Sequence, residues 1–241
     1  MKVHPLFLIA ILSAISPGFV SSALPAGLDG MSPADANLIQ SYAPVMITRE
    51  MWGARPASSS MKPHHPSAII IHHTGVAANP LITIEAKMRN LQAFSQKEKH
   101  RSPMGTTSMW PDVPYHFYID LSGHIAEGRD IHFAGDTNTN YDTTGFIQVV
   151  VEGDFEKEFP SPEEVDAVES LLSWIMLNWT LAPKQITAHK DHASTDCPGR
   201  NFLASFSKII ANAADRRAAA VASLCKGDPG PKLRQLYCQS R

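Results

Sequence analysis

Two runs of β-branched residues limit the possible folds of this chain more than any other feature. SAIIIHHTG (67–75) and GFIQVVVEGDF (145–155) are apolar over the length of a strand and end in polar residues. Each run is typical of a buried strand. Two more strands are expected around a turn at 121–123 in YHFYIDLSGHIAEGRD, and QITAH (185–189) predicts a last short strand.

Helical patterns lie between these strands. Residues 82–100 carry apolar side chains at helical spacing, and 101–114 are rich in turn formers and predict a loop. SPEE (161–164) fits a capping box, with serine at the N-cap, proline at N1 and glutamate at N3; its helix should stop before Pro183. A final helix is expected over 201–224. The alternation predicts an α/β fold with a mixed central β-sheet flanked by helices.

The N-terminal stretch MKVHPLFLIAILSAISPGFVSSALPAG has the layout of a secretory signal peptide: a lysine, an apolar run and then small residues. An uncleaved membrane anchor is the alternative, but breaks at 13–18 leave the run short of the about 20 residues that span a bilayer. We expect a signal peptide over 1–23, a loose leader over 24–45 with a short helix opening at Ser32-Pro33, one domain over 46–215 and a tail over 216–241. The protein would then be secreted or periplasmic, with no integral membrane segment after cleavage.

The charge of the chain argues against two classes of partner. The formal net charge is -2, and the lysines and arginines are scattered along the sequence. Binding to nucleic acid or to an anionic membrane calls for a clustered basic surface. We therefore expect no nucleic-acid partner.

The chain has three cysteines, an odd number for a protein exported to an oxidising compartment. Cys225 and Cys238 flank twelve residues that include a Pro/Gly-rich turn, and a disulfide between them would close a small loop in the tail. Cys197 is then left over. A buried inert thiol and a metal ligand are the two interpretations of Cys197.

Histidines stand at the ends of two predicted strands. His72 and His73 end the first β-branched run, and His189 ends the last short strand, eight residues before Cys197. Two imidazoles and one thiolate suit Zn²⁺ and leave its fourth position open, as in catalytic sites. The loop between His189 and Cys197 is long enough to curl back to one ion. The spacing matches no standard short zinc pattern, so solvated or hydrogen-bonded histidines stay an alternative at this point.

Five blocks in order give the chain a family resemblance: ITREMWGARP, AIIIHHTG, PYHFYIDLSGHIAEGRD, VVVEGDF and AHKDHASTDCPG. Together they resemble the type 2 N-acetylmuramoyl-L-alanine amidases, a family that includes the peptidoglycan recognition proteins and the T7-type phage lysozyme amidase. The similarity covers residues 47–210. It implies the amidase fold for the domain over 46–215 and a zinc hydrolase that cleaves the amide between N-acetylmuramic acid and L-alanine in peptidoglycan or its fragments.

The resemblance also implies roles for single residues. His72, His189 and Cys197 match the family's zinc ligands, and zinc lowers the pKa of bound water to about 7. Tyr115 matches the tyrosine beside that water, and Thr195 falls at a position of the family that can hydrogen-bond to the reacting carbonyl. Trp110 and His73 are expected to contact substrate.

The chain departs from the family pattern at two places. Val150 stands where the muropeptide-recycling branch carries a candidate base. Glu152, two residues on, is expected to be a solvated carboxylate at a strand end, and a residue that supports the site from behind is the alternative. The stretch 135–145 lacks the histidine that is common in the family. A non-catalytic peptidoglycan-binding protein of the same fold is therefore the second hypothesis. A zinc amidohydrolase acting on another amide is the third.

Other histidines and tryptophans are given structural interpretations. We expect surface or loop histidines at five positions: His64, His65, His116, His124 and His132. Trp52, Trp174 and Trp179 are expected in the core, and NWT (178–180) is a glycosylation pattern within a predicted helix.

Overall fold

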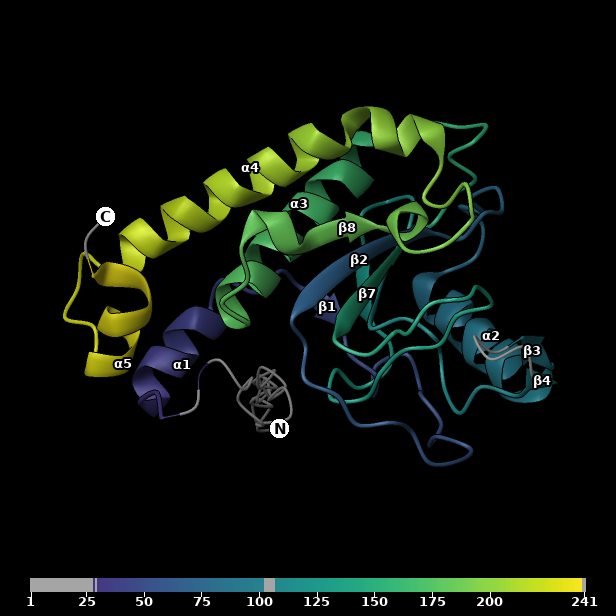
Figure 1. Ribbon diagram of the computed structural model, residues 1–241, viewed down its shortest axis with the longest axis horizontal. Helices are drawn as coiled ribbons and strands as arrows, with labels where there is room; N and C mark the ends of the chain where they lie inside the picture. The colour runs from purple at the N-terminus through teal and green to yellow at the C-terminus, as the bar shows by residue number, and fades with distance from the viewer. Residues whose placement is uncertain (1–27, 29, 102–106, 240–241) are drawn as a thin grey trace, which may run out of the picture.

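The computed structural model describes residues 28, 30–101 and 107–239, and a six-stranded mixed sheet lies at its centre (Figure 1). The predicted signal peptide over 1–23 lies outside the described residues. In spatial order the strands are β1 (Met46–Ile47), β6 (Ile125–Glu127), β5 (Phe117–Ile119), β7 (Phe146–Val151), β2 (Ala68–His73) and β8 (Ile186–Ala188). β5 and β6 are antiparallel and the other neighbours are parallel, which confirms the predicted mixed sheet.

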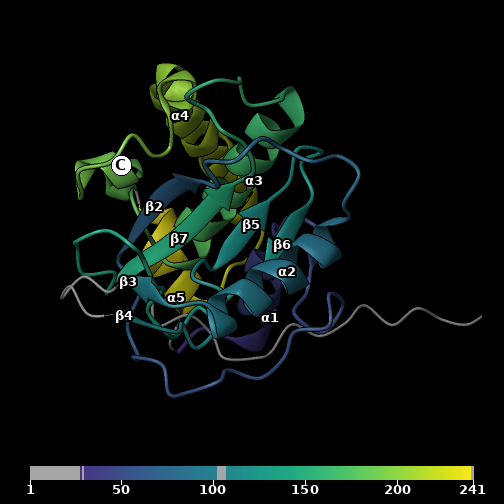
Figure 2. The same ribbon diagram turned by 90° about the vertical axis from the view of Figure 1, so that its right-hand side faces the viewer.

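Helices cover both faces of this sheet (Figures 1 and 2). α3 (Pro162–Asn178) and α4 (Arg200–Leu224) pack on one face, and α2 (Ile84–Lys97) packs on the other. The alternation of side chains along β7 explains the division. Val149 and Val151 contact the α3 and α4 side, whereas Val150 contributes to the cluster that contains Ile84 of α2.

The capping box predicted for the start of α3 is present. The Ser161 hydroxyl accepts a hydrogen bond from the backbone N–H of Glu164, and the Glu164 carboxylate accepts one from the N–H of Ser161. These bonds satisfy backbone donors that a helix start leaves open. The helix begins at Pro162, as the sequence predicts, and its last residue is Asn178.

The structure corrects two expectations about loops. The described part of 101–114 is not all loop, because β3 (His100–Arg101) pairs with β4 (Thr107–Ser108). The described part of the leader is more ordered than expected, although its short helix begins where the sequence predicts: α1 (Pro33–Gln40) follows the N-cap Ser32. Its Ile39 packs in a buried cluster with residues of α3, α4 and the tail.

The C-terminal tail folds back onto the end of α4. A disulfide joins Cys225 to Cys238, as the sequence predicts. Between them lie α5 (Pro231–Leu233) and a π-helical turn (Arg234–Cys238). Leu233 is fully buried in the cluster that includes α1, so both ends of the described chain meet beside the main domain.

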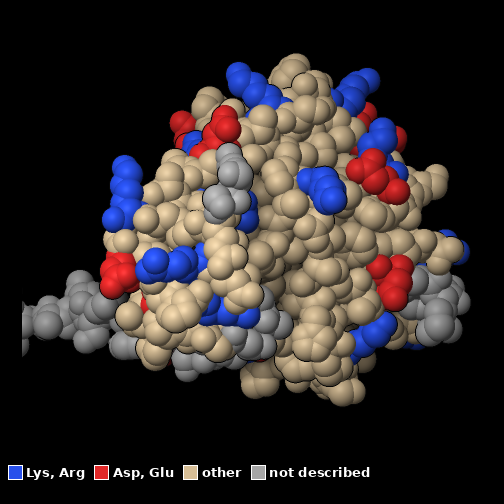
Figure 3. All heavy atoms as spheres, turned by 60° about the vertical axis from the view of Figure 1, so that its left-hand side comes forward, with Lys and Arg blue, Asp and Glu red and all other residues tan. Residues whose placement is uncertain are grey.

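Charged side chains are mixed in sign on the face shown in Figure 3, where lysines and arginines lie among aspartates and glutamates. Large uncharged areas separate them. Among the residues that the structure describes, no helix combines the length and apolar character that crossing a bilayer requires.

Candidate metal centre

The pairing of two parallel strands brings the first two candidate ligands together. Ile71 of β2 pairs with Ala188 of β8. The next residues along these strands are His72 and His189, so both histidines stand at the same edge of the sheet. Their ring centroids are 4.5 Å apart. The strand register, not the sequence spacing, makes these two residues neighbours.

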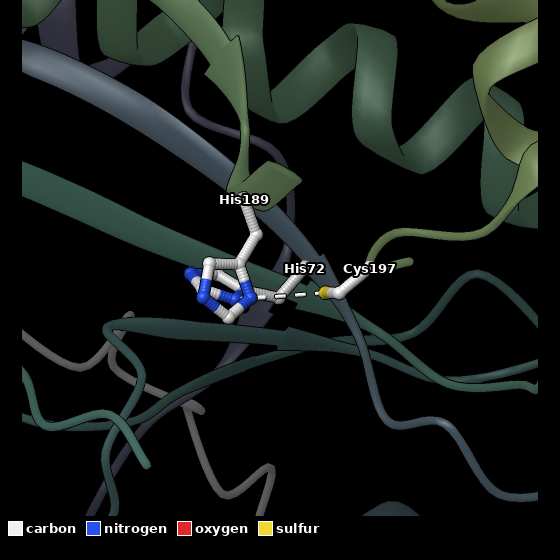
Figure 4. A group of neighbouring side chains, drawn as sticks. All are labelled: His72, His189 and Cys197. Carbon is white, nitrogen blue, oxygen red and sulfur yellow. Dashed lines mark hydrogen bonds between the residues drawn. The ribbon is translucent and has the colours of Figure 1, made fainter. Parts of the chain in front are cut away.

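The loop after β8 returns the third candidate, Cys197, to this edge. The backbone N–H of Lys190 donates to the carbonyl of Cys197 at 2.9 Å, which closes the loop. The N–H of His73 donates to Cys197 Sγ at 3.3 Å. The three side chains therefore converge from β2, from the end of β8 and from the segment before α4 (Figure 4).

The donor atoms of this group fit a zinc ion. One atom from each of His72, His189 and Cys197 lies within 4.8 Å of the others, and Cys197 Sγ is 3.8 Å from His72 Nδ1. Zinc binds sulfur at about 2.3 Å and imidazole nitrogen at about 2.0 Å, so donors around one ion lie about 4 Å apart or less, and a donor pair at the 4.8 Å limit would have to approach by about 1 Å to share one ion. His72 Nε2 and His189 Nδ1 are buried and have no hydrogen-bond partner among the described residues.

Burial keeps these donors neutral in the absence of a cation. Burial lowers the pKa of His189 to about 4 and brings that of His72 well below its ordinary value, and each is lowered further by neighbouring histidines. Burial raises the pKa of the Cys197 thiol to about 12. The thiol must therefore lose a proton when a metal binds, whereas the imidazoles are ready as donors.

A cleft with a volume of about 210 Å³ opens above the three donors. The three candidate ligands, Tyr115, the two predicted substrate contacts (Trp110 and His73) and residues 136–139 all line this cleft. Its lining residues are His72, His73, Thr74, Gly75, Trp110, Tyr115, Asp136, Thr137, Asn138, Thr139, His189 and Cys197. A larger groove of about 570 Å³, beside β1 and the start of α3, shares no residue with it.

Tyr115 and Trp110 both reach the cleft, in different ways. The Tyr115 ring lies 5.2 Å from the His72 ring, and burial raises the pKa of its phenol, which stays protonated. Trp110 is only 7% exposed and stacks on His100, with centroids 3.9 Å apart. Trp110 therefore offers one edge to the cleft, and most of its surface is covered by protein.

His73 and Thr195 each accept a hydrogen bond from a backbone N–H group. His73 Nδ1 accepts from the backbone N–H of Phe155 at 3.2 Å. Thr195 is not among the residues that line the cleft, and its hydroxyl accepts from the N–H of Cys197 at 3.2 Å. The structure thus gives Thr195 a contact that shapes the ligand loop.

A buried arginine that no sequence pattern singles out fixes the walls of the cleft. Arg129 Nε donates to the carbonyl of Val113 at 2.9 Å, and its other nitrogens donate to Ala134 and to the Asp136 carboxylate. It thereby joins the segment before Tyr115 to the segment that carries residues 137–139. Gly128 lies next to it, where a Cβ atom would collide with the carbonyl oxygen of Tyr115.

Two of the histidines expected at the surface or in loops are buried instead, and their rings form hydrogen bonds with the backbone. His116 is 1% exposed, accepts from the N–H of Gln148 and bonds through Nε2 to the Phe133 carbonyl. Its ring stacks on that of His64, which is also buried and accepts from the N–H of Gly145. Burial lowers the pKa of His116 to about 3. Neutral imidazoles therefore anchor the chain between β6 and β7.

Glu152 is also buried, contrary to the expectation of a solvated carboxylate. It is 4% exposed and pairs with Lys87 of α2 at 2.6 Å. It also accepts from the N–H groups of Asn79 and Leu121. The position of the family's candidate base holds Val150, which is fully buried. Neither Glu152 nor Val150 lines the cleft.

The remaining expectations concern aromatic and glycosylation positions. Trp52 and Trp174 are buried, and Trp179 is partly buried against the main core. Asn178 of the NWT pattern is 1% exposed, so its amide is closed to modification in the folded protein.

Comparison with known proteins places this site in a family context. Residues 62–200 match the profile of the family described as N-acetylmuramoyl-L-alanine amidase. The chain is 30% identical over 174 residues to peptidoglycan-recognition protein SD of Drosophila simulans, a match that covers 69% of this chain and 86% of the relative. It is 30% identical over 185 residues to N-acetylmuramoyl-L-alanine amidase of Sus scrofa, which covers 73% of this chain but 29% of the pig protein.

A solved structure has the same architecture. A point mutant of Drosophila PGRP-LB, in complex with tracheal cytotoxin, superposes with a TM-score of 0.56 at 27% identity. The match covers 67% of this chain and 92% of that one. The mixed sheet flanked by helices is thus the fold of these relatives.

Proposed function

Because the chain belongs to the N-acetylmuramoyl-L-alanine amidase family, we propose that it is a zinc-dependent hydrolase of peptidoglycan. The bond that it would cleave is the amide between N-acetylmuramic acid and L-alanine. The observation that carries this proposal is the cluster of His72, His189 and Cys197 within 4.8 Å at the base of a cleft. A set of two imidazoles and one thiol leaves a zinc ion one open position for water or substrate.

His72, His189 and Cys197 would hold the zinc, which supplies a water of lowered pKa and polarises the scissile carbonyl. The protein residues then orient the substrate. Tyr115 keeps its proton because burial raises the pKa of the phenol, so it acts as a hydrogen-bond donor to the developing oxyanion and not as a base. The Thr195 hydroxyl accepts from Cys197 N–H and so holds the ligand loop in place from outside the cleft.

Peptidoglycan or its muropeptide fragments are the proposed partners. The PGRP-LB mutant of similar fold is in complex with tracheal cytotoxin, which supports a muropeptide ligand. Trp110 and His73 both line the cleft and would contact the sugar or the stem peptide. We further propose that residues 1–23 are a signal peptide, that 46–215 form the amidase domain and that the protein is secreted or periplasmic.

A non-catalytic peptidoglycan-binding protein is the second candidate. It is favoured by the 30% identity to a peptidoglycan-recognition protein and by the 135–145 segment, which lacks a histidine common in the family. Retention of Cys197 beside both histidines supports the enzyme instead, because a thiolate completes the donor set for zinc.

Zinc content measured together with amidase activity separates the two candidates. The enzyme proposal predicts one equivalent of zinc in the protein, and loss of both zinc and amidase activity in Cys197→Ser and His189→Ala. His65→Gln, an exposed histidine outside the cleft, serves as the matched control and should keep both. Tight muropeptide binding that persists without zinc, in a protein that releases no product with zinc, would establish the binding protein.

A further inference from the structure

A threonine outside the predicted site contacts one of the candidate zinc ligands. Thr139 Oγ1 lies 2.6 Å from His189 Nε2. This is the one hydrogen bond of the His189 ring to a described residue, since His189 Nδ1 is buried without a partner. The bond therefore fixes the direction of the imidazole and leaves Nδ1 as the nitrogen that is free to bind a metal.

A second threonine supports the first. Thr137 Oγ1 is 2.8 Å from Thr139 Oγ1 and accepts from the Thr139 backbone N–H at 3.1 Å. Thr137 is 6% exposed, and the segment that carries it is held by the hydrogen bonds of Arg129 to Ala134 and Asp136. These hydrogen bonds hold the backbone that carries Thr139, and so they fix the position of its hydroxyl.

The direction of these hydrogen bonds follows from the chemistry of a metal-bound histidine. A neutral imidazole has one N–H, and the nitrogen that binds a metal must be without it. With Nδ1 of His189 as the metal donor, Nε2 carries the proton and donates to Thr139 Oγ1. The Thr139 hydroxyl then donates to Thr137 Oγ1, whose second lone pair accepts the Thr139 N–H.

We propose that Thr139, buttressed by Thr137, is a positioning residue that selects the Nε2–H tautomer of His189 and presents Nδ1 to the metal. The proposal rests on the proposed zinc function and extends it to the residues that hold the ligands in place. Partners of this kind orient metal-binding histidines, and removal of one weakens metal binding by about 10- to 100-fold. Because a hydroxyl is uncharged, we expect an effect near the lower end of that range.

The chain contains a matched control for this contact. Thr187 Oγ1 lies 2.9 Å from His192 Nε2, so it makes the same type of bond to a histidine that is outside the donor group. Thr139 and Thr187 are both partly buried. Thr187→Val therefore removes a comparable hydroxyl close to the site without touching a ligand.

The test measures the zinc dissociation constant by competition with a chromophoric chelator. Thr139→Val should weaken zinc binding about 10-fold, whereas Thr139→Ser and Thr187→Val should stay within about twofold of the parent protein. In the zinc-loaded parent protein, ¹⁵N NMR should show His189 protonated at Nε2 and a slowly exchanging Hε2. That proton should exchange faster with solvent in Thr139→Val. Circular dichroism and thermal unfolding verify that each variant is folded.

Several outcomes would overturn the proposal. These are an unchanged zinc affinity in Thr139→Val, an equal loss in Thr187→Val, a His189 proton on Nδ1 in the zinc-loaded protein, or a parent protein that binds no zinc. Binding is measured without turnover, so the proposed hydrolase activity can fail while this inference stands. A parent protein that binds zinc but cleaves nothing would be that case.

Discussion

Lys87 of α2 and Glu152, which follows β7, form an ion pair at 2.6 Å with side chains only 9% and 6% exposed. The Glu152 carboxylate also accepts from the N–H of Asn79 in the β2–α2 connection and from the N–H of Leu121 in the β5–β6 turn. One buried carboxylate thus joins α2 to two loops at the edge of the sheet.

Removal of the lysine should destabilise the fold more than loss of a surface pair. Lys87→Met leaves a buried carboxylate without its counter-ion, and we expect the free energy of unfolding to fall by about 3 kcal/mol. The double variant Lys87→Met/Glu152→Gln should recover part of that loss, because it leaves no unpaired charge, although the single amide oxygen can replace only one of the two carboxylate oxygens that accept from Asn79 and Leu121. Urea unfolding measures all three proteins. A change below about 1 kcal/mol in Lys87→Met would mean that the pair behaves as an exposed one.

The buried position of Glu152 could not be predicted from the sequence, whereas the strand before it could. The β-branched run within residues 146–151 predicts the strand correctly, because the composition that favours a buried strand lies in adjacent residues. The partner of Glu152 lies 65 positions away on α2. No pattern of neighbouring residues indicates the pairing of Glu152 with Lys87. From the sequence alone, a carboxylate before a glycine at a strand end is therefore expected to be solvated.

The candidate zinc ligands could be predicted from the sequence, whereas the residues that hold them in place could not. His72, His189 and Cys197 could be selected because family blocks surround them and because strand ends collect polar groups. Thr139 and Arg129 could not be selected, since their roles depend on the folded path of the 129–139 segment, of which residues 136–139 line the cleft. The missing family histidine in 135–145 marked this segment as unusual, but not which of its side chains contacts a ligand.

Glu164 at the start of α3 gives a pH-dependent prediction. Burial raises the pKa of this carboxyl to about 7 in the folded protein. Since this folded pKa exceeds the unfolded one, the contribution of the group to stability is complete below about pH 4.5 and is lost as the pH rises through 7. Glu164→Gln keeps the capping-box acceptor for Ser161 N–H and stays neutral.

We therefore expect Glu164→Gln to stabilise the protein at pH 8 more than at pH 5. Unfolding midpoints in urea at the two pH values measure the difference. Glu163→Gln, which lies one residue earlier in the same helical turn and is exposed, is the matched control. Equal effects of Glu164→Gln at both pH values would contradict the raised pKa.

Zinc binding should release a proton from the thiol. Burial raises the pKa of Cys197 to about 12 and lowers that of His189 to about 4, so at pH 6 the thiol is protonated and His189 is neutral. Because zinc binds the thiolate, we expect about one proton released per zinc at pH 6, and tighter binding as the pH rises. Calorimetric titrations in two buffers of different ionisation enthalpy count the protons. No release at pH 6 would mean that Cys197 is not a ligand or is already a thiolate.

The disulfide should stabilise the tail and leave the metal centre independent of it. Cys225 and Cys238 are 13 positions apart, and a loop of about this size contributes about 3 kcal/mol in the chain-entropy account. In Cys225→Ser/Cys238→Ser we expect faster hydrogen exchange over 231–238 and in α1, with unchanged zinc content. Peptide mapping of the unreduced parent protein should show Cys225 linked to Cys238, and Cys197 reactive once zinc is chelated. A disulfide that contains Cys197 would contradict the zinc assignment.

The most direct test of the central claim is mass spectrometry of the products that the zinc-loaded protein releases from purified peptidoglycan sacculi and from soluble muropeptides. We predict stem peptides with a free L-alanine amino terminus and glycan chains with free muramic acid carboxyls, and no such products from Cys197→Ser. Cleavage at a glycosidic or peptide bond, or no cleavage of either substrate by protein that holds one zinc, would contradict that claim.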